Sequence, residues 1–190
     1  EQLNDIGAAL SKERNTDRLL ENILVAAKTI THADGGTLYR LTDDRRHLRF
    51  EIMRTDSLNI RLGGTTGNGI AFPEVPLVNE RGEPNNAMVA AYAVINDKTV
   101  NIVDAYTEAG FDFSGTRKFD QKTGYRSTSF LTVPMKNHEN EIIGVLQLIN
   151  ALDPGSRKTV AFSYADQRLV ESLASQAAIA LTNRLLITQL

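Results

Sequence analysis

The chain has 190 residues, a length typical of one domain, and 21 Lys and Arg against 23 Asp and Glu give a formal net charge of −2. This balance excludes a basic nucleic-acid groove, and the absence of cysteine excludes disulfides, thiolate nucleophiles and thiolate metal sites. Without a long apolar run or a signal peptide, the sequence predicts a single cytoplasmic domain of residues 1–190 with no membrane insertion.

The amino-terminal part predicts two helices. A short apolar stripe between Leu3 and Leu10 indicates the first. The second has Thr16 as a plausible N-cap, and its apolar residues recur at helical spacing up to Thr31. The segment His32–Gly36 is expected to break this helix.

A strand pair and a long irregular segment follow. Thr37–Leu41 and Leu48–Met53 alternate as two strands of a hairpin. The glycine-dense segment Gly63–Gly69 lacks the lysine of a phosphate-binding loop and is interpreted as a flexible loop. The prolines in Phe72–Val78 favour an edge strand, since proline cannot donate to a central ladder.

The middle of the chain predicts a helix over Ala87–Ile95, capped by Asn85 or Asn86, and then a strand over Thr99–Val103. Tyr106–Thr116 has glycines and aromatic residues without periodicity, so we interpret it as an irregular covering segment.

The clearest signal is a hairpin made by Phe130–Met135 and Glu141–Ile149. The second run is apolar on both faces, which predicts a central strand covered on each side. Directly before the hairpin, Thr123–Ser129 is rich in hydroxyl groups that can donate to an anion or a polar ring.

The carboxyl-terminal part predicts a long helix. Ser163 and Asp166 have the spacing of a capping box. Ile179, Leu186 and Leu190 lie off the main apolar stripe, so the helix has a second face to bury. We therefore expect a homodimer that forms through the terminal helices.

Four runs in the second half of the chain carry a resemblance to a known family. The sequence NIVDAY at 101–106, DQKTGYR at 120–126, VPM at 133–135 and IGVLQLIN at 143–150 resembles the second half of a GAF domain. It is most similar to the regulatory GAF domains of cyclic nucleotide phosphodiesterases and bacterial adenylyl cyclases. The resemblance implies an α/β fold with a central antiparallel sheet of about six strands, the terminal helices on one face and a ligand pocket on the other.

The resemblance also implies a function. It indicates a sensory domain that binds a small molecule, with a cyclic nucleotide as a candidate, and relays occupancy to an attached phosphodiesterase, cyclase or kinase output domain. Bilin attachment and the free methionine sulfoxide reductase activity of this family both use cysteine, which this chain lacks. The alternative is a ligand-free dimerisation module with a vestigial pocket. His32, His47 and His138 show no converging spacing, so we predict no enzyme and no metal cluster, although one of them could ligate haem in principle.

Residue by residue, the family motifs imply a ligand site of seven positions. They are Thr37, Asn86, Ala87, Thr123, Arg126, Ser127 and Gln147. Asn86 and Ala87 would offer helix-start amides to a phosphate. Each of the others also has a structural interpretation: a turn-stabilising hydroxyl for Thr123, a surface ion pair for Arg126 and a satisfied polar group for Gln147.

One further family motif is incomplete here. Many cyclic-nucleotide GAF domains support the pocket with a lysine-to-aspartate clasp in an NK…FxxxDE pattern. Asn150, Phe162 and Asp166 match it, whereas Ala151 replaces the lysine and Gln167 the glutamate. The clasp therefore cannot form as it does in the family, which weakens the case for a cyclic nucleotide.

Overall fold

The computed structural model describes the backbone of residues 2–189 and the side chains of residues 3–185. Its helices are α1 (Gln2–Lys12), α2 (Thr16–Thr31), α3 (Val89–Asn96), α4 (Ser114–Thr123) and α5 (Tyr164–Gln189), with two short 3-10 turns, η1 (Asp56–Leu58) and η2 (Gly64–Thr66). The strands are β1 (Ala33–Leu41), β2 (His47–Thr55), β3 (Ile60–Gly63), β4 (Val75–Pro76), β5 (Val100–Ile102), β6 (Phe130–Lys136), β7 (Ile142–Leu152) and β8 (Thr159–Val160).

All eight strands form one antiparallel sheet. Six of them follow the order β3-β2-β1-β7-β6-β5, while the two-residue strands β4 and β8 pair with β2 and β7. The predicted strands correspond to β1, β2, β4, β5, β6 and β7, whereas β3 and β8 are additional. Strand β7 pairs with β1 on one side and β6 on the other, so the predicted central strand is confirmed.

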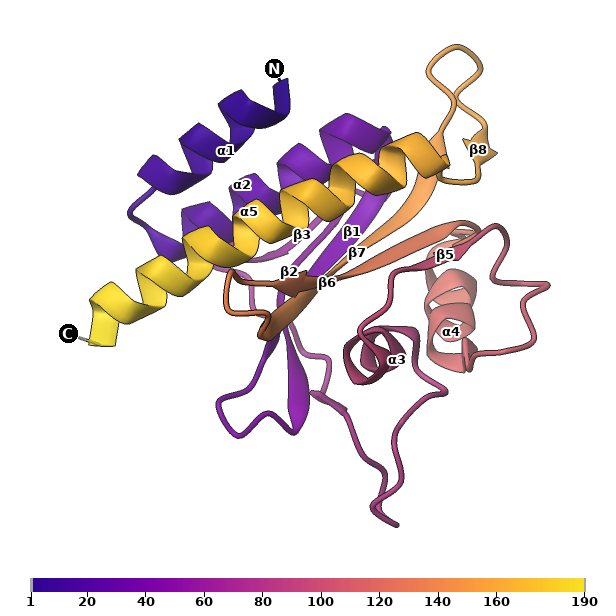
Figure 1. The fold of residues 1–190 in the computed structure, drawn as a ribbon. Helices are drawn as coiled ribbons and strands as arrows, with labels where there is room; N and C mark the ends of the chain where they lie inside the picture. The colour runs from indigo at the N-terminus through magenta and orange to yellow at the C-terminus, as the bar shows by residue number, and fades with distance from the viewer. Residues whose placement is uncertain (1, 190) are drawn as a thin grey trace.

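Helices α1, α2 and α5 cover one face of the sheet, and α3 and α4 lie on the other (Figure 1). Leu38, Leu146 and Leu148 point from the sheet into the layer formed by α1, α2 and α5, and they are fully buried among residues of α2 and α5. Burial of one such side chain contributes roughly 1.5 to 3 kcal/mol, so this layer is the main core. The packing of the terminal helices on one face is as predicted.

Helix α2 ends at Thr31 as predicted, but β1 begins at Ala33, earlier than the predicted start at Thr37. His32 is the left-handed C-cap of α2, with φ of 56°, and the strand follows at once. A Cβ on Gly36 would lie 2.6 Å from Leu24 Cδ1. Glycine in this strand therefore reflects the close approach of α2 to the sheet rather than a turn.

Several boundaries differ from the prediction. Asn15, not Thr16, caps α2, because its side chain accepts a hydrogen bond from Arg18 N at 3.0 Å. Helix α3 begins at Val89 after Met88, which makes no side-chain cap bond, so neither Asn85 nor Asn86 caps it. Strand β4 is shorter than the predicted edge strand.

Five elements were not predicted: helix α4, the short strands β3 and β8, and the turns η1 and η2. Helix α4 has the sequence SGTRKFDQKT, in which one apolar residue, Phe119, gives no periodic stripe. It starts inside the segment interpreted as irregular and ends at Gly124 with φ of 76°. Turn η2 lies in the glycine-dense loop, where Glu21 of α2 accepts hydrogen bonds from Thr65 N and Oγ1 at 2.6 and 2.7 Å.

No helix within residues 2–189 is long and apolar enough to cross a membrane. Among the described residues there is also no group of three or more His, Cys, Asp or Glu side chains arranged to hold a metal ion.

Candidate ligand-binding site

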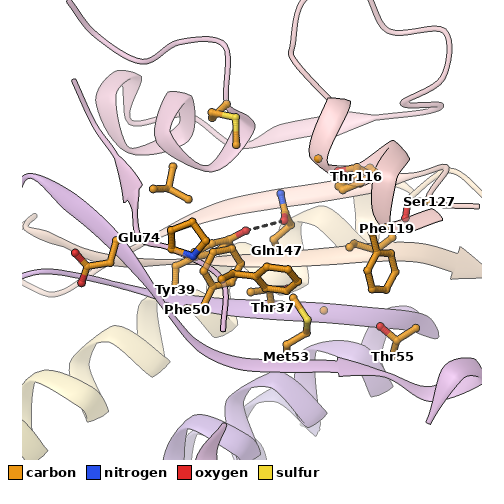
Figure 2. Close-up of a pocket in the computed structure, with 18 of the residues that line it drawn as sticks. Thr37, Tyr39, Phe50, Met53, Thr55, Glu74, Thr116, Phe119, Ser127 and Gln147 are labelled. Atoms are coloured by element: carbon orange, nitrogen blue, oxygen red, sulfur yellow. Dashed lines mark hydrogen bonds between the residues drawn. The ribbon is translucent and has the colours of Figure 1, made fainter. Parts of the chain in front are cut away.

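A cavity of about 490 Å³ lies on the sheet face opposite the terminal helices (Figure 2). The sheet forms its floor, while the segment before β4, the start of α3, helix α4 and the loop after α4 form its walls. The lining residues are Gly36, Thr37, Tyr39, Phe50, Met53, Thr55, Phe72, Pro73, Glu74, Val75, Pro76, Met88, Gly115, Thr116, Phe119, Tyr125, Ser127, Phe130, Gln147 and Ile149. Its volume is in the range of pockets that hold drug-sized ligands, about 300 to 1,000 Å³.

Polar side chains cross the floor of the cavity in a row. Thr37 of β1 and Thr132 of β6 lie opposite Gln147 of β7 on either side. Gln147 Nε2 donates to Thr132 Oγ1 at 3.0 Å, and the Tyr39 hydroxyl donates to Gln147 Oε1 at 3.4 Å. The Thr37 hydroxyl, in contrast, has no hydrogen-bond partner among the described residues although the residue is only 3% exposed. It is free to bind a ligand.

Aromatic rings form one end of the cavity. The Tyr39 and Phe50 ring centroids are 4.6 Å apart, and Phe50 and Phe72 are 5.4 Å apart. Tyr39 is buried, which raises the pKa of its hydroxyl and keeps it neutral. Phe72 is 47% exposed at the mouth. The stack therefore gives an apolar wall that leads from solvent to the polar floor.

A bulge in β2 makes this wall possible. Leu38 pairs with Ile52 but Tyr39 pairs with Phe50, so Glu51 is an extra residue. Without it, Phe50 and Met53 would point to opposite faces of the sheet, because successive strand residues alternate. Both line the cavity. Strand alternation from Thr37 could have predicted Tyr39 in the lining, but nothing in the sequence marks the bulge.

The cavity carries little charge. Glu74 is its one charged lining residue within the described part of the chain, and its carboxylate is 3.1 Å from Arg49 Nε at the surface. None of the three histidines lines it. The interior is thus neutral and largely apolar.

The motif before β6 is held by the buried carboxylate of Asp120, which is 5% exposed. Asp120 accepts hydrogen bonds from the Tyr106 hydroxyl at 2.5 Å and from Ser127 N and Oγ at 2.8 Å each. The Asp120 hydrogen bond is the largest cause of the raised pKa of Tyr106. Ser127 lines the cavity, but its hydroxyl proton is directed to Asp120, so only its oxygen lone pairs remain for a ligand.

The other predicted site residues lie outside the lining. The Thr123 hydroxyl donates to Phe119 O at 2.7 Å at the end of α4. The Arg126 guanidinium lies 4.1 Å from the Tyr106 ring centroid. Asn86 Oδ1 accepts from Asn96 Nδ2 at 2.9 Å.

Ala87 is also outside the lining, and its carbonyl accepts from Asp112 N at 2.8 Å. Of the seven predicted positions, the structure therefore brings Thr37, Ser127 and Gln147 together around one cavity.

The loop after α4 is fixed at both ends. Asn150 Oδ1 accepts from Thr128 N and Ser129 N at 2.7 and 3.2 Å, and its Nδ2 donates to Arg126 O at 2.8 Å. The Tyr125 hydroxyl donates to Asp34 Oδ2 at 2.7 Å. Burial and this bond raise the pKa of Tyr125, so the phenol stays protonated.

The positions of the incomplete clasp have structural roles here. Ala151 is 3% exposed in the core with α5. Gln167 Oε1 accepts from Asn101 Nδ2 at 3.1 Å, and Asp166 N donates to Ser163 Oγ at 3.1 Å as the first half of the predicted cap. Alanine has no charge to offer Asp166, so the family's ion pair is absent at this position.

A family model described as "GAF domain" matches residues 15–181 of the chain. A cGMP-specific 3',5'-cyclic phosphodiesterase of Drosophila mojavensis is 30% identical over 146 residues, which are 74% of this chain and 12% of the relative. The same enzyme of Drosophila melanogaster is 28% identical over 146 residues, with the same coverage of 74% and 12%. The chain thus corresponds to a small part of these relatives.

Solved structures share the fold. The GAF domain of an Acinetobacter phosphoenolpyruvate-protein phosphotransferase superposes with a TM-score of 0.69 at 14% identity, covering 100% of this chain and 96% of that one. The free methionine-R-sulfoxide reductase of Neisseria meningitidis gives 0.61 at 17% identity, covering 100% and 89%. At such identities these similarities concern the fold alone.

Proposed function

The chain belongs to the GAF domain family, and on that premise we propose that it is a sensory domain that binds a small molecule in the cavity and relays occupancy to an attached output domain. GAF domains are in general regulatory ligand-binding domains. The cavity carries the proposal, because it combines about 490 Å³ of space with a polar floor and aromatic walls. We also propose that residues 1–190 form one domain of a cytoplasmic signalling protein.

The floor favours a flat ligand with hydrogen-bonding edges. Gln147 gives one N–H to Thr132 and accepts once from Tyr39, so one N–H and one lone pair remain. Thr37 adds a free hydroxyl beside it. A heterocycle with a donor next to an acceptor, such as a purine base, matches this pattern, and the aromatic wall suits its faces.

The start of α3 suits an anionic group on the same ligand. Met88 lines the cavity, and the amides of Val89, Ala90 and Ala91 have no partner within the described residues. Such amides and the helix dipole attract a phosphate. The position predicted at Asn86 and Ala87 therefore moves about two residues along the chain. A cyclic nucleotide is the candidate that agrees with this chemistry and with the cGMP-specific relatives.

Calorimetric titration with cGMP and cAMP tests this proposal. We expect one of them to bind, and Thr37→Val to weaken it about two- to twelvefold, as the loss of a hydrogen bond of about 0.5 to 1.5 kcal/mol implies. Thr123→Val is the matched control, because this hydroxyl lies outside the lining and should leave affinity unchanged. Absence of binding to both nucleotides, or equal affinity in Thr37→Val, would contradict the proposal for a cyclic nucleotide.

A ligand-free dimerisation module is the second candidate, and the surface of α5 supports it. Leu169 and Ile179 are 41% and 37% exposed, so α5 presents apolar side chains that a second chain could cover. The Leu186 side chain and Leu190, which were also predicted for this face, lie outside the described residues. We propose a homodimer in either case. Sedimentation showing monomers at high concentration would refute it, and a dimer that binds neither nucleotide would favour this second function.

A further inference from the structure

We infer that Tyr125 transmits the state of the cavity to the carboxyl end of α2 through its hydrogen bond to Asp34. The inference rests on the proposed function, because it names how occupancy of that cavity is read out. It concerns the contacts that join a cavity wall to the helix layer on the other side of the sheet.

Tyr125 has two sides with different neighbours. The residue lines the cavity, and its hydroxyl donates to Asp34 Oδ2 at 2.7 Å, 91 residues away in the chain. The hydroxyl is therefore already used inside the protein, and a ligand meets the ring. A molecule that fills the cavity restricts the ring and, with it, the position of the hydroxyl.

Asp34 depends on this bond. The residue is 6% exposed and forms no salt bridge among the described residues. Its carboxylate accepts three hydrogen bonds: one from Tyr125, and two from Ser57, through Oγ at 2.5 Å and N at 3.1 Å. A buried charge needs its donors, because each missing one leaves part of the desolvation uncompensated. The Tyr125 hydroxyl is thus one of the three donors that hold Asp34 in place.

Asp34 lies where α2 passes into β1. It follows the C-cap His32 by two residues. Its partner Ser57 belongs to η1, and the preceding residue Asp56 forms an ion pair at 2.6 Å with Lys28, a buried residue of α2. Helix α2 packs against α5 in the terminal-helix layer (Figure 1).

These contacts define a local opening equilibrium with a predictable sign. In the empty domain the Tyr125 ring has free space beside it, so the hydrogen bonds of Asp34 to Tyr125 and Ser57 break more often. With the cavity filled, the ring is held and these hydrogen bonds stay formed. Ligand binding should therefore protect the end of α2 and η1 from opening.

Hydrogen-deuterium exchange of the empty protein tests the connection without a ligand. Tyr125→Phe should speed exchange about tenfold in the segments 28–36 and 55–59, as expected for loss of a hydrogen bond to a charged group. Tyr106→Phe is the matched control: it also removes a tyrosine-to-aspartate hydrogen bond, but at Asp120 and outside the cavity lining. Unchanged exchange in Tyr125→Phe, or an equal rise in Tyr106→Phe, overturns the inference whether or not a ligand is known.

The ligand arm uses saturating cGMP. The wild type and Tyr106→Phe should show protection of both segments, whereas Tyr125→Phe, saturated with cGMP according to its own measured Kd, should show none. Ser57→Ala, which leaves the lining intact, should lose the protection as well. A wild type that does not bind cGMP counts against the proposed ligand alone, and the empty-protein arm then decides. Protection that persists in Tyr125→Phe refutes the readout while the proposed function stands.

Discussion

Replacing Ser127 by alanine separates structural from ligand-binding roles in the loop after α4. The variant loses the 2.8 Å hydrogen bond from Ser127 Oγ to the buried Asp120, while the bond from Ser127 N remains. A hydrogen bond to a charged group contributes about 1.5 to 3 kcal/mol. For a chain of this size 1 kcal/mol changes the melting temperature by about 2 to 4 °C, so the empty variant should melt about 3 to 12 °C lower.

Chemical denaturation and thermal melting of the ligand-free protein measure this difference. Ser175→Ala is the control, because among the described residues this exposed hydroxyl bonds only to Glu171 O within α5, and its loss should change stability by about 0.5 kcal/mol or less. Cyclic-nucleotide affinity of Ser127→Ala should change little, since the wild-type proton is directed to Asp120. Wild-type stability combined with strongly reduced affinity would refute this reasoning and assign the hydroxyl to the ligand.

Two further predictions concern β1 and β2. Gly36→Ala should lower the free energy of unfolding by about 1 to 3 kcal/mol, because the new Cβ would lie 2.6 Å from Leu24 Cδ1 and 3.2 Å from Gln147 O; urea denaturation with an unchanged midpoint would contradict it. Burial raises the pKa of Glu51 above 4.5, so its charged form costs stability as pH rises through the folded pKa, and the cost is absent below 4.5. Glu51→Gln should therefore melt higher than wild type at pH 7 and lose that advantage towards pH 4; a difference independent of pH would refute it.

Local sequence patterns were sufficient for much of the fold. The hairpin of β6 and β7 could be predicted because β-branched runs and a polar turn are signals within about twenty residues. Its central place followed from apolar residues on both faces of β7. The apolar stripe of α2 likewise predicted a helix that is buried on one face.

The family motifs located the region of the site but not the individual contacts. Thr37 and Gln147 were predicted on the strands that form the floor, and they line the cavity. Thr123 and Arg126 belong to the same motif as Ser127, yet they lie outside the lining. A motif records that residues occur together, whereas the direction of each side chain depends on the backbone that carries it. Here that backbone is α4, whose sequence has no apolar stripe.

The remaining features arise from contacts between residues far apart in the chain. The bulge at Glu51 is defined only by the pairing of β2 with β1, and the Tyr39 to Gln147 bond joins residues 108 positions apart. Tyr125 and Asp34 are 91 positions apart. The sequence by itself determined the elements with a strong local pattern, such as α2, α5 and the β6–β7 hairpin, whereas α4, β3 and β8 have no such pattern and were not predicted. Which hydroxyls face the cavity and which are already bonded was decided by the tertiary structure, because a buried polar group takes its partner from whatever the packed chain brings within hydrogen-bonding distance.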